Sequence, residues 1–247
     1  MRRLAADHAA ERHVAVEAAL AIHDCDGGRN LQRAGNLDQF DRRTASGGDA
    51  LRAFDQTLAD LGTDYLDLFL IHWPLPDVGD YVETWKALEH MRKSGRVKAI
   101  GVSNFQPHHL QRLFDETETI PAVNQIEVHP YLTQDDVRAF NTEHGIVTEA
   151  WSPIAQGKVL GDPVITGIAD RVGKTPAQVT LRWHIQRGDV VFPKSVNRTR
   201  MEENFALFDF ELDADDMAAI DSLDRGEEGR TGFHPDRFNG FPADFQA

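Results

Sequence analysis

Two kinds of hydrophobic pattern alternate along the chain from about residue 50 onward. In one, apolar residues recur every three or four positions, as on one face of a helix, and Leu51, Phe54, Leu58 and Leu61 are an example. In the other, short continuous apolar runs are typical of buried β-strands. These runs predict strands at residues 66–71, 97–102, 122–126, 146–151, 190–192 and 208–210. Strands joined by helices run parallel with right-handed crossovers, so the pattern predicts a doubly wound sheet or a (β/α)8 barrel.

Polar residues mark where several of these helices begin. Thr175 is a good N-cap, Pro176 suits the first helical position, and Gln178 completes a capping box three residues after the cap. The same reasoning starts further helices at Thr133 and Asp213. The alternation of helix and strand therefore has local stop and start signals at its boundaries.

The first 49 residues break this rhythm. Residues 14–20 resemble one helix, and only weak strand candidates occur near Ile22 and Leu37, because residues 23–49 are rich in glycine and charged side chains. A closed barrel needs two further strands from this region. We therefore predict one domain over residues 1–247, with a poorly specified part at 1–49, βα units at 50–224 and a C-terminal loop at 225–247.

Composition narrows the class of protein. Lys and Arg number 26 against 40 Asp and Glu, which gives a net charge of −14 and disfavours binding to nucleic acid or to an anionic membrane surface. The single cysteine, Cys25, forms no intrachain disulfide and fits a reducing compartment. No apolar run is long enough for a membrane span. We expect a cytoplasmic, monomeric protein with a small-molecule partner.

Polar and aromatic residues collect where the predicted strands end, which is where a barrel carries its chemistry. Several of these segments are long and specific: DLFLIHWP at 67–74, IGVSNF at 100–105, PAVNQIEVHP at 121–130 and FPKSV at 192–196, followed by Arg200, Glu203 and Asn204. Together they resemble the aldo-keto reductase family, and Trp151 is similar to the bacterial diketogluconate reductase branch. The resemblance implies a (β/α)8 TIM barrel, here incomplete at its first two strands, that binds NADPH and transfers hydride to the carbonyl group of a small molecule.

The resemblance also implies roles for individual residues. Trp151 would stack on the nicotinamide ring, and Ser103, Asn104 and Gln125 would bind its carboxamide; the structural alternatives are a packing residue for Trp151 and a turn former for Asn104. His72 would polarise the substrate carbonyl, its alternative being a structural histidine. The other implied site residues are Trp73 in the substrate pocket and Ser152, Ser195, Val196, Glu203 and Asn204 around the cofactor.

Two cations favour NADP over NAD. Lys194 and Arg200 stand beside a helix start, where backbone N–H groups attract phosphate, and they match the charge of a 2′-phosphate. A solvated basic cluster is the alternative, although the acidic overall charge makes local positive charge unusual. No Gly-x-Gly-x-x-Gly segment indicates a Rossmann domain.

No metal site is predicted. His108 and His109 are adjacent, so we expect their side chains to diverge on a helix. Residues 23–26 contain possible ligands, but no second cluster at ligand spacing accompanies them. A hydrolase is disfavoured because neither paired carboxylates nor a nucleophile elbow follows a strand.

The chain departs from the family at the proton donor. The family uses a Tyr activated by a Lys that pairs with an Asp, all upstream of the His-Trp-Pro segment. Here Tyr65 is the only tyrosine before His72, and the first lysine is Lys86. A shifted reading frame, an internal deletion and true divergence are all compatible with this. Two functions follow, an NADPH-dependent carbonyl reductase and a non-catalytic NADPH-binding relic of the family.

Overall fold

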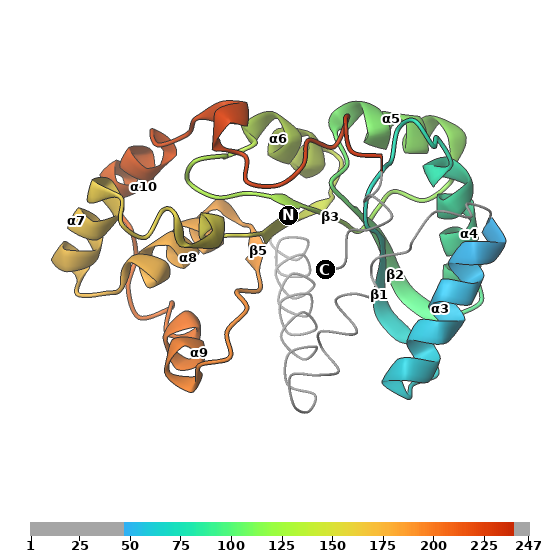
Figure 1. The fold of residues 1–247 in the computed structure, drawn as a ribbon, viewed down its shortest axis with the longest axis horizontal. Coiled ribbons are helices and arrows are strands. Elements are labelled where there is room, and N and C mark those ends of the chain that lie inside the picture. Colours follow the sequence, from blue (N-terminus) through green and yellow to red (C-terminus); the bar gives the residue numbers. More distant parts are fainter. Residues whose placement is uncertain (1–46, 240–247) are drawn as a thin grey trace, which may run out of the picture.

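Five parallel strands form one continuous sheet in the computed structural model, which describes residues 47–239 (Figure 1). The predictions for residues 14–37, including those on Cys25 and its neighbours, lie outside this range. The sheet order follows the chain, β1-β2-β3-β4-β5. The strands are β1 (Leu66–Ile71), β2 (Val97–Ser103), β3 (Val123–Glu127), β4 (Val147–Trp151) and β5 (Val190–Val191).

Helices connect the strands and cover one face of the sheet (Figure 1). Figure 1 shows the sheet as an arch, with α3, α4 and α5 at one end, α6 above its middle and the later helices at the other end. The helices are α3 (Gly47–Leu61), α4 (Tyr81–Lys93), α5 (Pro107–Glu116), α6 (Asp135–Glu143), α7 (Pro163–Val172), α8 (Pro176–Arg187), α9 (Arg198–Phe205) and α10 (Ala214–Asp221), with short 3-10 turns η2 (Ala155–Gly157) and η3 (Gly226–Gly229).

The parallel sheet agrees with the predicted barrel class, but it is not closed among the described residues: β1 and β5 each have one strand neighbour there. The prediction of a strand at 208–210 is wrong. Phe208 is 71% exposed and Asp209 forms an ion pair with Lys174 at 2.6 Å. Phe208 and Asp209 thus present their side chains to solvent, whereas Phe210 is half-buried against the apolar core that contains Trp183, so the segment packs on the helices and does not pair with the sheet.

The core has two parts, one between the sheet and the helices at each end of the arch. The first packs β1 and β2 against α3, α4 and α5 around Phe54 and Trp85. The second packs β3 and β4 against α6, α7, α8 and α10 around Trp183 and Ile165. All four of these side chains are fully buried. The apolar periodicity of the sequence therefore identifies the helix faces that hold the sheet.

Two of the three predicted helix starts are confirmed. Thr175 and Asp213 both cap their helices through capping boxes. The cap predicted at Thr133 is wrong by one residue, because the N-cap of α6 (Asp135–Glu143) is Gln134, in a left-handed conformation. The backbone N–H of Thr133 instead donates to Asp224 at 2.9 Å, a bond with a residue far along the chain.

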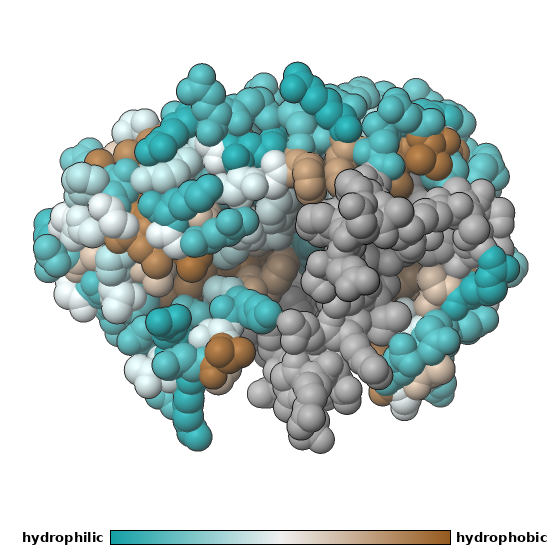
Figure 2. All heavy atoms as spheres, in the orientation of Figure 1, coloured by the Kyte–Doolittle hydropathy of each residue, from teal (hydrophilic) through white to brown (hydrophobic). Residues whose placement is uncertain are grey.

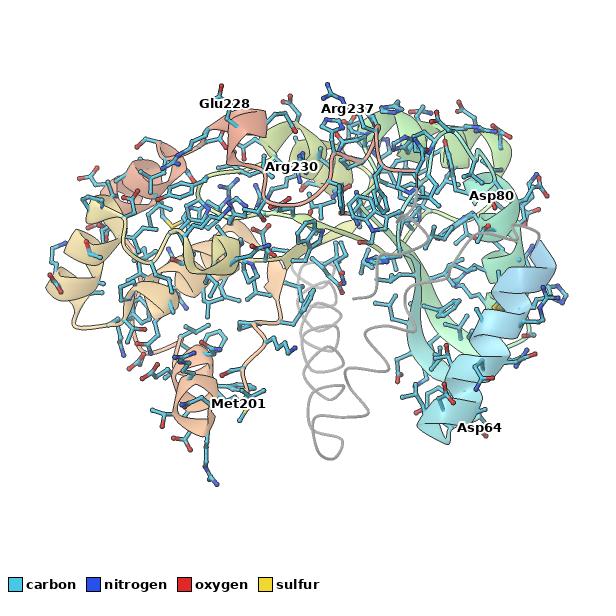
Figure 3. All side chains as sticks on the ribbon, viewed as in Figure 1. Asp64, Asp80, Met201, Glu228, Arg230 and Arg237 are labelled. Carbon is cyan, nitrogen blue, oxygen red and sulfur yellow. The ribbon has the colours of Figure 1, made fainter. Side chains whose placement is uncertain are left out.

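The described surface is largely hydrophilic, with exposed apolar side chains near α9 (Figure 2). These apolar residues are Val196, Met201, Phe205 and Phe208, and Figure 3 labels Met201 among them. Among residues 47–239, no helix combines the length and apolar character that a membrane crossing requires.

Gly101 is required by the packing between strands. A Cβ at this position would lie 2.5 Å from Cγ2 of Val123 and 2.7 Å from Cδ2 of Leu70. We expect Gly101→Ala to lower the free energy of unfolding by about 1–3 kcal/mol, the usual cost of overpacking, in urea denaturation. Gly167→Ala is the matched control: this glycine lies inside α7, and a Cβ there would have nothing within 4 Å, so the substitution should stabilise by about 0.5–1 kcal/mol. Equal effects of the two substitutions would contradict the packing argument.

Candidate functional site

The predicted site residues of the first four strands gather at one edge of the sheet. His72 directly follows β1, Ser103 ends β2, Gln125 lies in β3 and Trp151 ends β4. Because the strands are parallel and in register, their carboxyl ends lie side by side. This edge carries the candidate functional site.

Asn104 connects all four strand ends. Its Nδ2 donates to the carbonyl oxygen of His72 at 3.0 Å and to Oγ of Ser103 at 3.1 Å. Its backbone N–H donates to the carbonyl oxygen of Gln125 at 2.8 Å, and its Oδ1 accepts from Nε1 of Trp151 at 2.8 Å. The residue has φ 63°, a left-handed conformation that Asn tolerates better than most residues, and it is 3% exposed. The predicted alternative, a turn former, thus describes its backbone but not its side chain.

Trp151 is fixed at both ends of its indole. Nε1 is held by Asn104, while the opposite edge lies against Gly232, where a Cβ would be 2.4 Å from the indole Cη2. The side chain is nevertheless half-exposed. A rigid, partly exposed indole provides a flat surface on which an aromatic ring can stack.

The polar atoms left around this edge suit a primary carboxamide. Oγ of Ser103 donates to the carbonyl oxygen of Gln125 at 2.8 Å, and Oδ1 of Asn104 keeps one lone pair beside its bond from Trp151. Nε2 of Gln125 donates to Glu149 at 3.0 Å, while its Oε1 accepts no bond from the described residues. A carboxamide NH2 group needs acceptors, which this edge supplies, so the residues present fit the nicotinamide amide.

The predicted phosphate-binding residues lie in a separate segment after β5. Lys194 and Arg200 are exposed, and neither forms an ion pair with another described residue. Asn197 caps α9 by accepting the N–H of Arg200 at 3.2 Å, and Oγ of Ser195 donates to the carbonyl oxygen of Asn197. Val196 is 92% exposed. The remaining predicted residues, half-buried, are Ser152 after β4 and Glu203 and Asn204 in α9. Within residues 47–239, none of them bonds to the Asn104 cluster.

Trp73 faces the C-terminal segment, and His72 lies beside Trp73. Trp73 is buried and packs on Phe238 with ring centroids 4.5 Å apart. The ring of His72 lies 5.9 Å from that of Trp73 and is half-buried. The predicted pocket residue therefore has an apolar neighbour that the sequence places only in a C-terminal loop.

We name residues 226–239 of that loop the C-terminal strap. How the strap is anchored was not predicted from the sequence. Glu127, fully buried at the end of β3, accepts from the backbone N–H of Thr231 at 2.7 Å and of Gly232 at 3.1 Å, and from Nε2 of His129 at 3.1 Å. Burial alone would raise the pKa of Glu127, but these hydrogen bonds lower it below its ordinary value. Figure 3 labels Arg230 along the strap, with its Nη1 3.7 Å from Glu127. The carboxylate is thus ionised and holds the strap to the strand ends.

The strap is also held at its far end. Oδ1 of Asp236 lies 3.3 Å from Nε2 of His108 and 3.6 Å from Nε2 of His109. The expectation that the two histidines diverge is wrong, because their rings lie 4.0 Å apart and both face this carboxylate. Asn239 donates to Asp77 at 2.7 Å. In Figure 1 the strap accordingly passes from the α10 end of the arch to the α5 end.

His108, His109 and Asp236 have the composition of a metal site, with ligand atoms within 4.8 Å of one another. However, Nδ1 of His109 accepts the backbone N–H of Gln106 at 3.2 Å, so the neutral ring carries its proton on Nε2. The same Nε2 faces Asp236, which makes it a donor and not a metal ligand. The geometry is that of a polar latch between the strap and α5.

No tyrosine serves the strand-end edge. The chain has three, all of them described: Tyr65 precedes β1, Tyr81 is buried beside Phe105, and Tyr131 donates to Asp162 at 2.9 Å. Burial raises the pKa of both Tyr81 and Tyr131, the opposite of what a phenolic proton donor requires.

We expect loss of the Asn104 side chain to loosen the strand ends. Asn104→Gly keeps the left-handed backbone but removes three side-chain hydrogen bonds, so unfolding in urea should become easier by about 2–4 kcal/mol. Gln156→Gly is the control, because Gln156 also has a positive φ, 56°, but is exposed. That variant should be neutral or slightly stabilised, and a comparable loss in both would refute the role of the amide.

His109 makes stability depend on pH. Burial, and then the neighbouring His108, lower the pKa of His109 to about 4 from 6.5. Between these values the unfolded chain binds the proton and the folded chain does not, so stability from this residue falls as pH drops from about 6.5 to about 4. The loss is about 3 kcal/mol at 1.36 kcal/mol per pKa unit. The free energy of unfolding of His109→Phe, which keeps the aromatic contacts, should decline less over this range; parallel curves would contradict the assignment.

Comparisons with known proteins agree with this geometry. The aldo/keto reductase family profile matches residues 35–225. The chain is 56% identical over 189 residues to an aldo-keto reductase of Mycolicibacterium smegmatis, covering 76% of this chain and 68% of that protein. It is 50% identical over 186 residues to the methylglyoxal reductase DkgA of Escherichia coli K12, covering 74% and 67%. A variant of Gox0644 in complex with NADPH is similar in structure, with a TM-score of 0.75, 52% identity, and coverage of 77% and 70%. The chain belongs to the aldo/keto reductase family, whose members use NADP(H).

Proposed function

We propose that this chain binds NADPH at the carboxyl ends of its strands and reduces a small aldehyde or ketone. The observation that carries the proposal is the Asn104 cluster, which holds an indole surface and carboxamide-binding atoms together at one edge. When bound, the cofactor supplies the hydride. The residues of the chain orient the nicotinamide: Trp151 beneath the ring, and Ser103, Asn104 and Gln125 at its amide.

Cofactor selection is assigned to the segment after β5. Lys194 and Arg200 lack ion-pair partners among the described residues and stand at the start of α9. Each charge-assisted contact with a 2′-phosphate contributes about 1.5–3 kcal/mol, which favours NADPH over NADH by at least about tenfold. The same segment contains four other predicted cofactor residues, Ser195, Val196, Glu203 and Asn204. Ser152 directly follows Trp151 in the sequence.

The substrate is a small carbonyl compound. Trp73 and Phe238 form an apolar wall beside His72. Relatives that are 50–51% identical in sequence are named methylglyoxal reductases. Such compounds present a carbonyl oxygen that His72 polarises by a hydrogen bond. Negative charge develops on this oxygen as hydride is transferred.

Proton delivery limits the rate. A positioned donor contributes about 10²–10⁴-fold, and no tyrosine of this chain lies at the site. We therefore propose slow turnover that depends on His72. The second candidate function is NADPH binding without turnover, which the missing phenol favours.

One set of measurements tests both. Fluorescence titration should show NADPH binding at least about tenfold tighter than NADH, and Lys194→Ala should abolish most of that preference. Lys86→Ala, an exposed lysine on α4, is the matched control and should leave the preference unchanged. Equal affinity for the two cofactors would remove the phosphate assignment.

The absorbance of NADPH with methylglyoxal and other aldehydes then measures turnover. We expect a rate at least about 10²-fold below that of E. coli DkgA measured in parallel, and lower still for His72→Ala. Absence of any turnover with intact binding would favour the non-catalytic function. A rate equal to that of DkgA would show that another donor is at work.

A further inference from the structure

Three polar side chains form a row across the concave face of the sheet. The register pairs Ser103 with Gln125, and Gln125 with Glu149. Thr148, the neighbour of Glu149, bonds to Asn141 of α6 at 3.0 Å and so faces the helices. Since successive side chains of a strand point to opposite faces, Glu149 and Gln125 face away from the helical layer.

Glu149 is a buried carboxyl with little support. It is 7% exposed, and the one hydrogen bond that its carboxyl accepts among the described residues comes from Nε2 of Gln125 at 3.0 Å. Burial raises its pKa. Glu127, on the same face of the neighbouring strand β3, accepts several hydrogen bonds and has a lowered pKa. The pKa values of the two glutamates are therefore shifted in opposite directions, by burial for Glu149 and by converging donors for Glu127.

Packing does not explain a carboxyl at this position. Val123 and Val147 occupy the preceding places on the same face of β3 and β4, so an aliphatic side chain suits this layer. Burying a carboxyl with one partner costs free energy that an apolar residue of similar size avoids. The position therefore calls for a role of the hydrogen bond itself.

We propose that Glu149 is a positioning residue that fixes the amide of Gln125 for the nicotinamide carboxamide. By accepting from Nε2, it decides which end of the Gln125 amide faces inward and leaves Oε1 for a ligand N–H group. This role deepens the proposed function and rests on it.

The physical reason is the near-symmetry of an amide group. Its oxygen and nitrogen ends have nearly the same size, so an unsupported glutamine samples both orientations and several rotamers. A ligand must then order the side chain on binding. A partner that orders it beforehand strengthens binding, as preorganisation does elsewhere.

Two ligands separate this role from a general structural one. NADPH carries the nicotinamide, whereas 2′-phospho-ADP-ribose has the same phosphate and adenosine parts without it. Fluorescence and calorimetric titrations would compare both ligands on the full chain and on variants. The variants are Glu149→Leu, Glu149→Asp, Glu149→Gln, Gln125→Leu and the double variant Glu149→Leu/Gln125→Leu.

We expect Glu149→Leu to weaken NADPH about tenfold, the effect of one lost hydrogen bond, and to leave 2′-phospho-ADP-ribose unchanged. Glu149→Asp should behave alike, because its carboxyl is one methylene too short to reach Gln125, and it serves if the leucine variant does not fold. Glu149→Gln, whose Oε1 can accept the same bond, should restore NADPH affinity to within about twofold of the original. The double variant should bind NADPH no more weakly than Gln125→Leu, since the two residues act in series.

Equal weakening of both ligands by Glu149→Leu, or no weakening of NADPH, would overturn the positioning role while the proposed function stands. Additive losses in the double variant would do the same. If the unaltered chain bound neither ligand, the proposed function itself would fail and this inference with it.

Discussion

The hydrogen bonds of Asn104 hold together the edge of the sheet that carries the candidate functional site. Four strand ends meet there, and all four are bonded to one buried, left-handed residue, through its Nδ2, its Oδ1 and its backbone N–H. Parallel strands have no direct connection at their carboxyl ends, because each crossover begins there and leaves the sheet. A side chain with two donors and an acceptor fixes the spacing of these ends, including the angle of Trp151, more firmly than the short ladders alone.

The C-terminal strap adds a second layer over the same edge. Glu127 is ionised because backbone and side-chain donors of the strap converge on it, and Asp236 and Asn239 hold the other end to α5 and to the loop after β1. Gly232 then lies against the indole of Trp151, where any side chain would collide. The strap thus makes the platform rigid and places Phe238 beside Trp73.

In the proposed function, cofactor binding and proton delivery depend on different groups of this member of the aldo/keto reductase family. The groups that would orient a nicotinamide and recognise a phosphate are present in the described residues, while no tyrosine of the chain lies where a phenol could protonate the product. Cofactor binding depends on many modest contacts, whereas proton delivery depends on one correctly placed group. A site without such a group is therefore expected to lose far more turnover than affinity.

The alternation of helices and strands, five of the strands, the helix caps at Thr175 and Asp213, and the family could all be predicted from the amino-acid sequence. Periodicity, capping and contiguous motifs are local along the chain, so they need no knowledge of the fold. Two predictions from the sequence were wrong, a strand at 208–210 and a helix cap at Thr133. The first depends on which side chains are buried and the second on a hydrogen bond to Asp224, and both are properties of the folded chain. Only the tertiary structure brought Asp236 to His108 and His109, Glu127 to Thr231, and Glu149 to Gln125. Each of these joins residues distant in the sequence, and the charge state of a carboxyl depends on donors that the fold alone places around it.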